Sequence, residues 1–278
     1  MKIYISFFLF FLLNVNVFSQ NIDETIFLGD ENFNHGDYSQ AIKYYKRVLF
    51  FSKDKYIANK RIADSYFKIK EYDFANNYYD SAIVYCLNRK DIFELKFKKA
   101  DCSIFLKEYN KANKIVSALN IKETNDLFFK KNFYLGIINF AKLNYDSAEI
   151  FFIKSVSDTS LYTKEKIHSL FKKSRNLKRP NPKFAGALSV VLPGAGQLYA
   201  GDYKNAINSF LLVGIFVAIG TDMCMRYAWY DSAISIFPWF YRYYQGGYKN
   251  AMSIAKKKQK IKRNKKLNEI IKVIGQKK

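Results

Sequence analysis

The 278-residue chain is poor in the residues on which metal proteins rely. It has two histidines, His35 and His168, and three cysteines, Cys86, Cys102 and Cys224. The cysteines form no C-x-x-C pair and no zinc spacing, and two histidines are too few for a metal constellation. The sequence therefore predicts no metal site.

Motifs that carry catalysis are missing too. The chain contains no G-x-S-x-G and no H-E-x-x-H sequence. Gly194 and Gly196 could begin a nucleotide-binding loop, but Tyr199 stands where the third glycine should be and no G-K-[ST] follows. Asp222 and Arg226 are four residues apart and are expected to pair at a helix end. We expect a protein that is not an enzyme and that has no cofactor.

Acidic residues are few, 24 against 46 lysines and arginines, which gives a formal net charge of +22. The basic residues gather in residues 172–183 and in the tail from Lys256. Charge of this sign suits anionic lipid headgroups or nucleic acid. Because no nucleic-acid recognition fold accompanies it, we expect a membrane partner and no nucleic acid.

A pattern returns four times between residues 22 and 162. Each copy has a small residue, a tyrosine nine places later and an alanine three places after that, and the tyrosines are 34, 37 and 36 residues apart. A fixed period near 34 is typical of stacked helix-turn-helix units, in which small residues let two helices approach closely. The copies are Gly29/Tyr38/Ala41, Ala63/Tyr72/Ala75, Ala100/Tyr109/Ala112 and Gly136/Tyr145/Ala148.

This pattern resembles the tetratricopeptide repeat (TPR). The resemblance implies an all-α solenoid of about four helix-turn-helix repeats over residues 22–162. In the third copy, Lys99 and Val116 replace an apolar and an aromatic residue, and three extra residues at Asn88 to Lys90 predict a longer turn. The eight helices are expected at 22–34, 38–51, 56–69, 72–86, 93–106, 109–119, 129–142 and 145–157.

In this family the first helices line a concave groove that binds peptides. By the resemblance, the groove of this chain would carry Asp30, Asp64 and Asp101, with Phe33 and Phe67 three places after the first two. Such a groove suits a protein or peptide ligand with basic and apolar residues, unlike the carboxylate-clamp members with their Lys and Asn. The alternative is that the aspartates are solvated and the phenylalanines belong to the core.

Residues 1–19 are typical of a secretory signal peptide. Lys2 supplies the positive start, residues 3–18 the apolar run, and Val17-Phe18-Ser19 a small-residue cleavage site. The run is short for a spanning helix. We expect the repeats to be exported, with an uncleaved anchor as the alternative.

Residues 163–183 are expected to form a capping helix and a basic linker. Thr163 can cap a helix that runs to Ser174, and a solenoid needs such a cap over its last open core. The apolar face of this helix would consist of Ile167, Leu170 and Phe171.

Residues 184–255 are rich in apolar residues and predict a hydrophobic helical membrane module. Three segments, 184–200, 206–221 and 228–244, are at or just below spanning length, and the middle one alone lacks charge and proline. The first is interrupted at Pro193-Gly194. The third mixes Asp231 and Arg242 with tryptophan and tyrosine, which suits a membrane interface.

The first segment ends in a motif rich in glycine. It resembles the PGxGQxYxG signature of small bacterial membrane modules that often follow TPR repeats in envelope proteins. Glycines allow close backbone approach or a tight turn, and the polar residues would need partners at membrane depth. Helix packing and a functional role both fit these residues: Pro193, Gly194, Gly196, Gln197, Tyr199 and Gly201.

The basic tail, residues 256–278, suits the anionic face of a bilayer. It ends with an apolar pattern at Leu267, Ile270, Ile271 and Ile274.

Together these features predict a TPR scaffold or adaptor of the bacterial cell envelope, anchored in the cytoplasmic membrane with the repeats on the exported side. The alternative makes the membrane module the active part, as a small carrier or lipid-handling unit regulated by the repeats. Basic stretches on both sides of the module favour an even number of crossings. An exported array with a cytoplasmic tail requires an odd number, which we expect. Cys86 and Cys102 could lie close together, as two buried thiols rather than a bridge.

Overall fold

The computed structural model describes residues 21–122, 126–156, 161–172, 174–227 and 229–275. Within these ranges the regular structure is entirely helical. The chain divides into two compact units, Met1–Lys142 and Leu143–Lys278, which are described separately. The predicted signal peptide, residues 1–19, lies outside the described residues.

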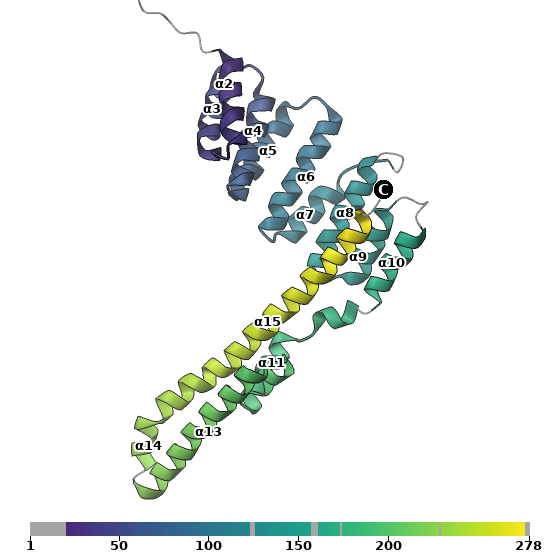
Figure 1. The fold of residues 1–278 in the computed structure, drawn as a ribbon. Coiled ribbons are helices and arrows are strands. Elements are labelled where there is room, and N and C mark those ends of the chain that lie inside the picture. Colours follow the sequence, from purple (N-terminus) through teal and green to yellow (C-terminus); the bar gives the residue numbers. More distant parts are fainter. Residues whose placement is uncertain (1–20, 123–125, 157–160, 173, 228, 276–278) are drawn as a thin grey trace, which may run out of the picture. The chain divides into compact units, whose positions relative to one another are not determined.

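Unit 1 is a stack of antiparallel helix pairs, as the repeat pattern predicts (Figure 1). α2 packs on α3, α4 on α5 and α6 on α7, and each pair contacts the next. The helices begin and end within four residues of the expected positions. Their bounds are α2 Ile22–Asn34, α3 Tyr38–Phe51, α4 Lys55–Lys68, α5 Tyr72–Tyr85, α6 Arg89–Phe105, α7 Tyr109–Ser117 and α8 Asp126–Ala141.

The turn within each repeat has the same backbone shape. Gly36 has φ 86°, and Lys70, Lys107 and Leu143 have φ 67°, 63° and 65° at the matching positions of the other three copies. Glycine adopts this left-handed conformation without steric cost, whereas the other residues must be held in it by the helices on either side. The same conformation at four sites spaced like the tyrosines is independent support for the repeat.

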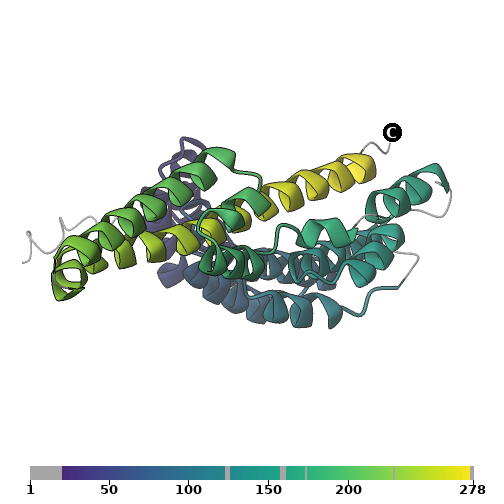
Figure 2. The same cartoon turned by 90° about the horizontal axis from the view of Figure 1, so that it is seen from below.

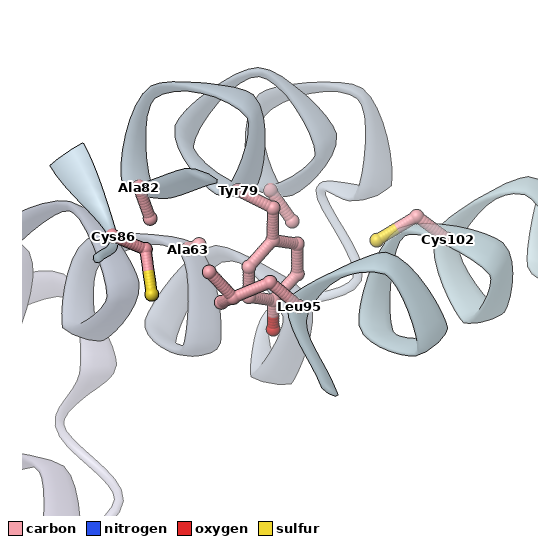
Figure 3. Packing of buried hydrophobic residues seen from close by; sticks show 7 residues of the cluster. Ala63, Tyr79, Ala82, Cys86, Leu95 and Cys102 are labelled. Atoms are coloured by element: carbon pink, nitrogen blue, oxygen red, sulfur yellow. The ribbon is translucent and has the colours of Figure 1, made fainter. Parts of the chain in front are cut away.

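The small residues of the pattern lie where helices cross. A Cβ on Gly29 would come within 2.5 Å of Cε1 of Tyr45, so this aromatic ring occupies the space that glycine leaves. In the second repeat Ala63 is fully buried against Tyr79, together with Ala82 and Leu95 (Figure 3). The packing predicted from small and aromatic residues is confirmed.

The extra residues before the third repeat do not lengthen the turn, so that prediction is wrong. Residues 86–88 join α5 to α6, and residues 52–54 join α3 to α4, so the two connections are equally long. The Asn88 side chain accepts a hydrogen bond from the Lys90 amide and caps α6, which has 17 residues where α4 has 14. The insertion therefore adds almost one turn of helix.

Cys86 and Cys102 are two buried free thiols, as expected in preference to a disulfide. In Figure 3 they lie on either side of the Tyr79 ring. Burial raises the pKa of the Cys102 thiol to about 12, and the carboxylate of Asp101 adds to the shift.

Unit 2 begins with the second helix of the fourth repeat and the predicted capping helix. α9 (Tyr145–Lys154) packs against α10 (Leu161–Phe171), whose Ile167 and Phe171 are buried as expected. A short 3-10 helix, η1 (Ser174–Lys178), then leads to the apolar part of the chain.

The apolar part forms four further helices and one long one that joins them. α11 (Pro182–Val191) and α12 (Ala195–Tyr199) are separated at Pro193-Gly194, as predicted. α13 (Tyr203–Arg226) is longer than expected, and the third segment is divided between α14 (Trp229–Ser235) and α15 (Phe237–Gly275). α15 continues without interruption into the basic tail, so no helix boundary separates module from tail.

α13 and α15 form an antiparallel hairpin with α14 at its turn (Figures 1 and 2). Ser209 of α13 lies opposite Gly247 of α15, and further along Phe216 stacks on Tyr243 with ring centroids 5.2 Å apart. α11 also runs antiparallel to α15, since Gly186 meets Met252 while the Tyr244 hydroxyl donates to the Val190 carbonyl at 2.5 Å. α15 is therefore the central helix of this unit.

α13 is the one helix among the described residues that is long and apolar enough to cross a membrane, judged by length and composition alone. Only 6% of its apolar stretch is buried in the protein.

Candidate functional site

The three aspartates expected in the groove lie at equivalent positions of α2, α4 and α6, and each accepts a hydrogen bond from a tyrosine. The Tyr45 hydroxyl of α3 donates to Asp30 at 2.6 Å, and Arg61 of α4 forms an ion pair with the same carboxylate. The carboxylate is thus shared between its own repeat and the next. The Asp30 side chain keeps 29% of its surface exposed.

Asp64 repeats this arrangement one repeat later. The Tyr79 hydroxyl of α5 donates to its Oδ1 at 2.5 Å, and Nζ of Lys98 in α6 lies 3.1 Å from the same oxygen. Such charge-assisted hydrogen bonds are among the stronger ones in proteins. The second repeat is linked to the third by this pair, as the first is linked to the second.

Asp101 also accepts a hydrogen bond from a tyrosine, but this tyrosine stands at a different position in the sequence pattern. The tyrosine that lies 15 residues after Asp30 and Asp64 is replaced here by Val116, which is fully buried. The hydroxyl of Tyr134, from α8, donates to Asp101 Oδ2 at 3.0 Å instead. The donor now comes from the next repeat, so it links two repeats by itself.

Burial dominates the electrostatics of these pairs. It raises the pKa of Tyr45, Tyr79 and Tyr134, and the neighbouring aspartate raises it further, so the phenols remain protonated donors. Burial also raises the pKa of Asp101, against the lowering effect of the Tyr134 hydrogen bond.

Phe33 and Phe67, the other two predicted groove residues, are half-buried and pack within the array. Phe33 meets the Tyr38 ring edge-on at 5.1 Å. Phe67 contacts Tyr72 and Phe105 at centroid distances of 5.4 and 5.6 Å. The five predicted residues are thus engaged with other residues of unit 1, and whether they bind a partner stays a prediction.

A different surface of unit 1 carries exposed apolar side chains, and the sequence reasoning missed it. They lie at and just after the C-terminal ends of α3 and α5, and we call them the apolar edge. Lys55, the first residue of α4, has its Nζ 5.9 Å from the centroid of the Tyr85 ring, so Tyr85 lies close to the start of α4. The sequence did contain a sign of this surface, because Val84 and Tyr85 lie 34 positions after Phe50 and Phe51. The apolar edge consists of Phe50, Phe51, Val84, Tyr85 and Leu87, exposed by 80, 55, 77, 48 and 101%.

In unit 2 the glycine motif joins three helices. A Cβ on Gly196 would lie 2.8 Å from the carbonyl carbon of Ala185 and still closer to its oxygen, so α12 approaches the backbone of α11 directly. Gly194 has φ 93°, and a Cβ there would lie 2.5 Å from the Ala206 carbonyl oxygen of α13. Glycine is required at both positions.

Gln197 is fully buried and hydrogen-bonded at both ends of its amide. Its Oε1 accepts from the Ser189 hydroxyl at 2.8 Å, and its Nε2 donates to the Gly247 carbonyl of α15 at 2.9 Å. Ser189 Oγ in turn accepts from the Gly196 amide at 3.0 Å. Gln197 thus provides hydrogen-bond partners for buried polar groups at the junction of the helices.

The remaining motif residues hold the junction from its periphery. The Tyr199 hydroxyl accepts a hydrogen bond from the Asn181 amide at 3.1 Å. Gly201 has φ 72°, and its carbonyl accepts from Lys258 at 2.6 Å. Pro193 lies in the break between α11 and α12. These contacts support the packing interpretation of the motif.

A cleft of about 410 Å³ opens beside this junction, between α13 and α15. Its polar residues include one cation, Arg242, and no carboxylate. We call it the amide cleft. It is lined by Gln197, Asn205, Asn208, Ser209, Leu212, Val213, Arg242, Tyr243, Gly246, Gly247 and Asn250.

Across the part of the chain that the structure describes, no group of three or more His, Cys, Asp or Glu residues could hold a metal ion. The Asp222 carboxylate accepts from Arg226 Nε at 2.8 Å, as the sequence predicted.

The chain is an all-helical protein of stacked helix pairs, consistent with a repeat array. No protein-family model matches it, and no curated protein matches it in sequence.

Proposed function

We propose that the protein is a membrane-anchored adaptor, in which the helical array holds a protein partner and the hairpin of α13 and α15 fixes it in a bilayer. The exposure of α13 carries this proposal. Its outward apolar side chains include Phe210, Leu211, Ile215 and Ile219, each 44 to 55% exposed. An apolar surface of this extent is unfavourable in water and favourable in lipid.

The hairpin supports an even number of crossings, contrary to the odd number expected from sequence. With 24 residues, α13 is about 36 Å long, enough for a hydrocarbon core of about 30 Å. Exposed Trp229 and Tyr230 at the turn suit the far interface. α15 then returns beside α13 and contacts α10, so α10 and the basic tail lie on one side of the membrane.

We assign that side as the exported one. The predicted signal peptide favours it, and folded domains cross a membrane largely regardless of their charge.

For partner binding we favour the apolar edge over the predicted groove. The carboxylates of Asp30 and Asp64 already form ion pairs with basic residues of the array, so a ligand must compete with these residues for the carboxylates. The side chains of the apolar edge are exposed by 48 to 101%, and large exposed apolar patches mark interaction surfaces. An apolar helix or loop of an envelope protein is the partner that fits it.

Cysteine labelling in intact cells tests the anchor, and the chain offers a natural probe. Cys224 is exposed near the turn of the hairpin, whereas Cys86 and Cys102 are buried and should stay silent. Single cysteines replacing Lys68 in unit 1 and Lys257 in the tail, both in a Cys224→Ser background, complete the set. A membrane-impermeant maleimide should label the two new cysteines from outside, and Cys224 only after permeabilisation.

Labelling of Cys224 and the tail cysteine from the same side would refute the hairpin. In the same membranes, a photo-cross-linker at Val84 should give a discrete adduct, and one at Lys68 should not. Equal adducts at both positions would exclude the apolar edge as the docking surface.

A second candidate function makes the hairpin itself the active part, as a lipid-handling unit with the array as its regulatory domain. The amide cleft favours this function. An unpaired arginine beside lipid is energetically unfavourable, so its presence there indicates a functional site.

A further inference from the structure

Basic segments that are distant in the sequence meet at the base of the hairpin. Nε2 of Gln259 in α15 donates to the Lys178 carbonyl of η1 at 2.8 Å. One residue earlier, Lys258 donates to the Gly201 carbonyl, just before α13, at 2.6 Å. η1, the start of α13 and residues 256–260 of α15 therefore lie at one level of unit 2. The basic linker and the basic tail, separate in the sequence, become one surface in the fold.

α11 begins at the same level. Its Gly186 meets Met252 of α15, and the two helices are antiparallel. Lys183, three residues before Gly186, therefore lies beside the part of α15 that follows Met252. The lysine is exposed, and it adds a charge from a third segment.

The start of α13 contributes a further lysine. Asp202, the N-cap of α13, accepts hydrogen bonds from the Asn205 amide and side chain at 3.2 and 2.8 Å. These bonds lower the pKa of Asp202, and the charges of Lys258 and Lys204 lower it further, so both lysines lie near this carboxylate. Asp202 is also the one acidic residue in the sequence segments 174–204 and 249–266. The positive charge at this level is therefore largely uncompensated.

We call the exposed cations at this level the basic belt. It consists of Lys178, Arg179, Lys183, Lys204, Lys256, Lys257 and Lys260.

Exposed aromatic rings lie at both ends of α13. Phe184 and Tyr203 are exposed close to the basic belt, and Phe184 meets the Tyr199 ring edge-on at 5.1 Å. Tyr227 and Trp229 are exposed at the other end. The 24 residues of α13 separate the two groups by about 36 Å, slightly more than a hydrocarbon core of about 30 Å. Aromatic residues are enriched at both membrane interfaces, so the basic belt is at headgroup depth when α13 spans a bilayer.

The two ends of the hairpin differ in charge. Around the turn, residues 221–242 contain two acidic residues, Asp222 and Asp231, and two basic ones, Arg226 and Arg242. The charges balance there, whereas the basic belt carries seven cations near the single carboxylate of Asp202. An anionic leaflet therefore attracts the end of the hairpin from which α15 continues to α10.

We propose that the basic belt binds anionic phospholipid headgroups in the leaflet on the α10 side of the membrane. This inference rests on the proposed anchoring by the hairpin, and it adds the class of lipid and the leaflet. A nucleic acid also attracts lysines. It would leave in water the exposed apolar surface that begins beside the basic belt with Phe184 and Tyr203, whereas a bilayer covers both surfaces.

Energy transfer to labelled lipids in nanodiscs tests the proposal with the full chain. The donor dye is placed on a cysteine that replaces Asn176, an exposed residue of η1, in a Cys224→Ser background, since Cys86 and Cys102 are buried. The nanodiscs consist of phosphatidylcholine with a small share of phosphatidylglycerol or phosphatidylcholine that carries the acceptor on an acyl chain. Phosphatidylglycerol should be enriched about fivefold near the donor, which is the effect of one lysine at an anionic surface. The preference should shrink in 1 M salt, where the screening length is about 3 Å.

Two double variants of α15 separate the basic belt from the rest of the tail. Lys256→Gln/Lys257→Gln should lose about half of the preference for phosphatidylglycerol, because it removes two of the seven cations closest to the headgroups. Lys265→Gln/Lys272→Gln is the matched control, since it removes the same charge from exposed positions of the same helix. These positions are roughly 12 and 22 Å further along α15, beyond the screening length of about 10 Å at ordinary ionic strength. The control should keep the wild-type preference.

The outcomes distinguish the basic belt from the anchor. A wild type that does not enter the nanodiscs would refute the anchor and the basic belt with it. Entry with equal energy transfer to the two lipids, or an equal loss in the two double variants, would overturn the basic belt alone. Binding of a DNA duplex without any preference for phosphatidylglycerol, abolished in Lys256→Gln/Lys257→Gln, would overturn the lipid assignment in favour of nucleic acid.

Discussion

Replacing Gly196 by alanine should destabilise unit 2 strongly, although it adds only one methyl group. The new Cβ would overlap the backbone carbonyl of Ala185 and the hydroxyl of Ser189. A serine side chain can rotate away, but a carbonyl in the middle of α11 cannot. α12 must therefore move, and the hydrogen bonds of Ser189 with Gly196 and Gln197 must lengthen.

The contributions can be added. Overpacking typically costs about 1–3 kcal/mol, and the two buried hydrogen bonds contribute about 1 kcal/mol each. The gain in helix propensity from glycine to alanine is about 1 kcal/mol. The net loss in unfolding free energy is about 3 kcal/mol, and at roughly 3 °C per kcal/mol the melting temperature should fall by about 10 °C.

Tryptophan fluorescence isolates the relevant transition, because the two tryptophans of the chain, Trp229 and Trp239, both belong to unit 2. The control is Gly214→Ala, the same change within α13 where the added methyl meets nothing within 4 Å. This variant should melt at or slightly above the wild-type temperature. Equal melting temperatures for Gly196→Ala and Gly214→Ala would refute the close approach of α12 to α11.

Two further predictions concern the array. Tyr79→Phe should cost about 1.5–3 kcal/mol by removing a hydrogen bond to a charged group, and the loss should shrink in an Asp64→Asn background. Tyr85→Phe, at a half-exposed ring, should change little, and equal losses in both phenylalanine variants in thermal denaturation by circular dichroism would contradict a stabilising role of the hydrogen bond from Tyr79 to Asp64. Tyr134→Phe should raise the pKa of Asp101 further. An aspartate whose pKa is raised in the folded state binds protons on folding, so stability falls as pH rises from 3.8 to the folded-state value and is level above it. The variant should extend this fall to higher pH, and stability curves parallel to those of the wild type would refute the role of Tyr134.

Much of unit 1 could be predicted because its determinants are local. Small residues, turns and caps recur within about 34 positions, and each helix packs against its neighbours in sequence. The donors of Asp30 and Asp64 were also within reach, since Tyr45 and Tyr79 both follow by 15 residues. The role of Tyr134 could not be predicted, because a valine occupies the matching position in the third repeat. Nothing in the sequence indicates that the donor to Asp101 comes from another repeat.

Unit 2 could not be predicted in the same way, because its contacts join distant residues. Gln197 bonds a carbonyl 50 residues away, and Gln259 donates to the Lys178 carbonyl 81 residues away. Composition changes sharply at Lys256, which favoured a separate tail, but composition does not end a helix. No proline interrupts α15 after Pro238, and Gly247, the second of two adjacent glycines, packs against Ser209 of α13.

The basic tail shows why this long-range packing matters for function. Its apolar pattern at Leu267, Ile270 and Ile271 would suit a helix lying on a membrane surface. In the structure Ile270 is fully buried, and α15 contacts α10, so the protein uses this face for its own packing. The tail can then meet a bilayer only with its lysines and arginines. Their attraction to anionic headgroups is screened within about 10 Å at ordinary ionic strength, whereas the apolar surface of α13 loses nothing to salt. In the proposed anchoring, the hairpin therefore provides the attachment to the bilayer, and the tail packs against α10.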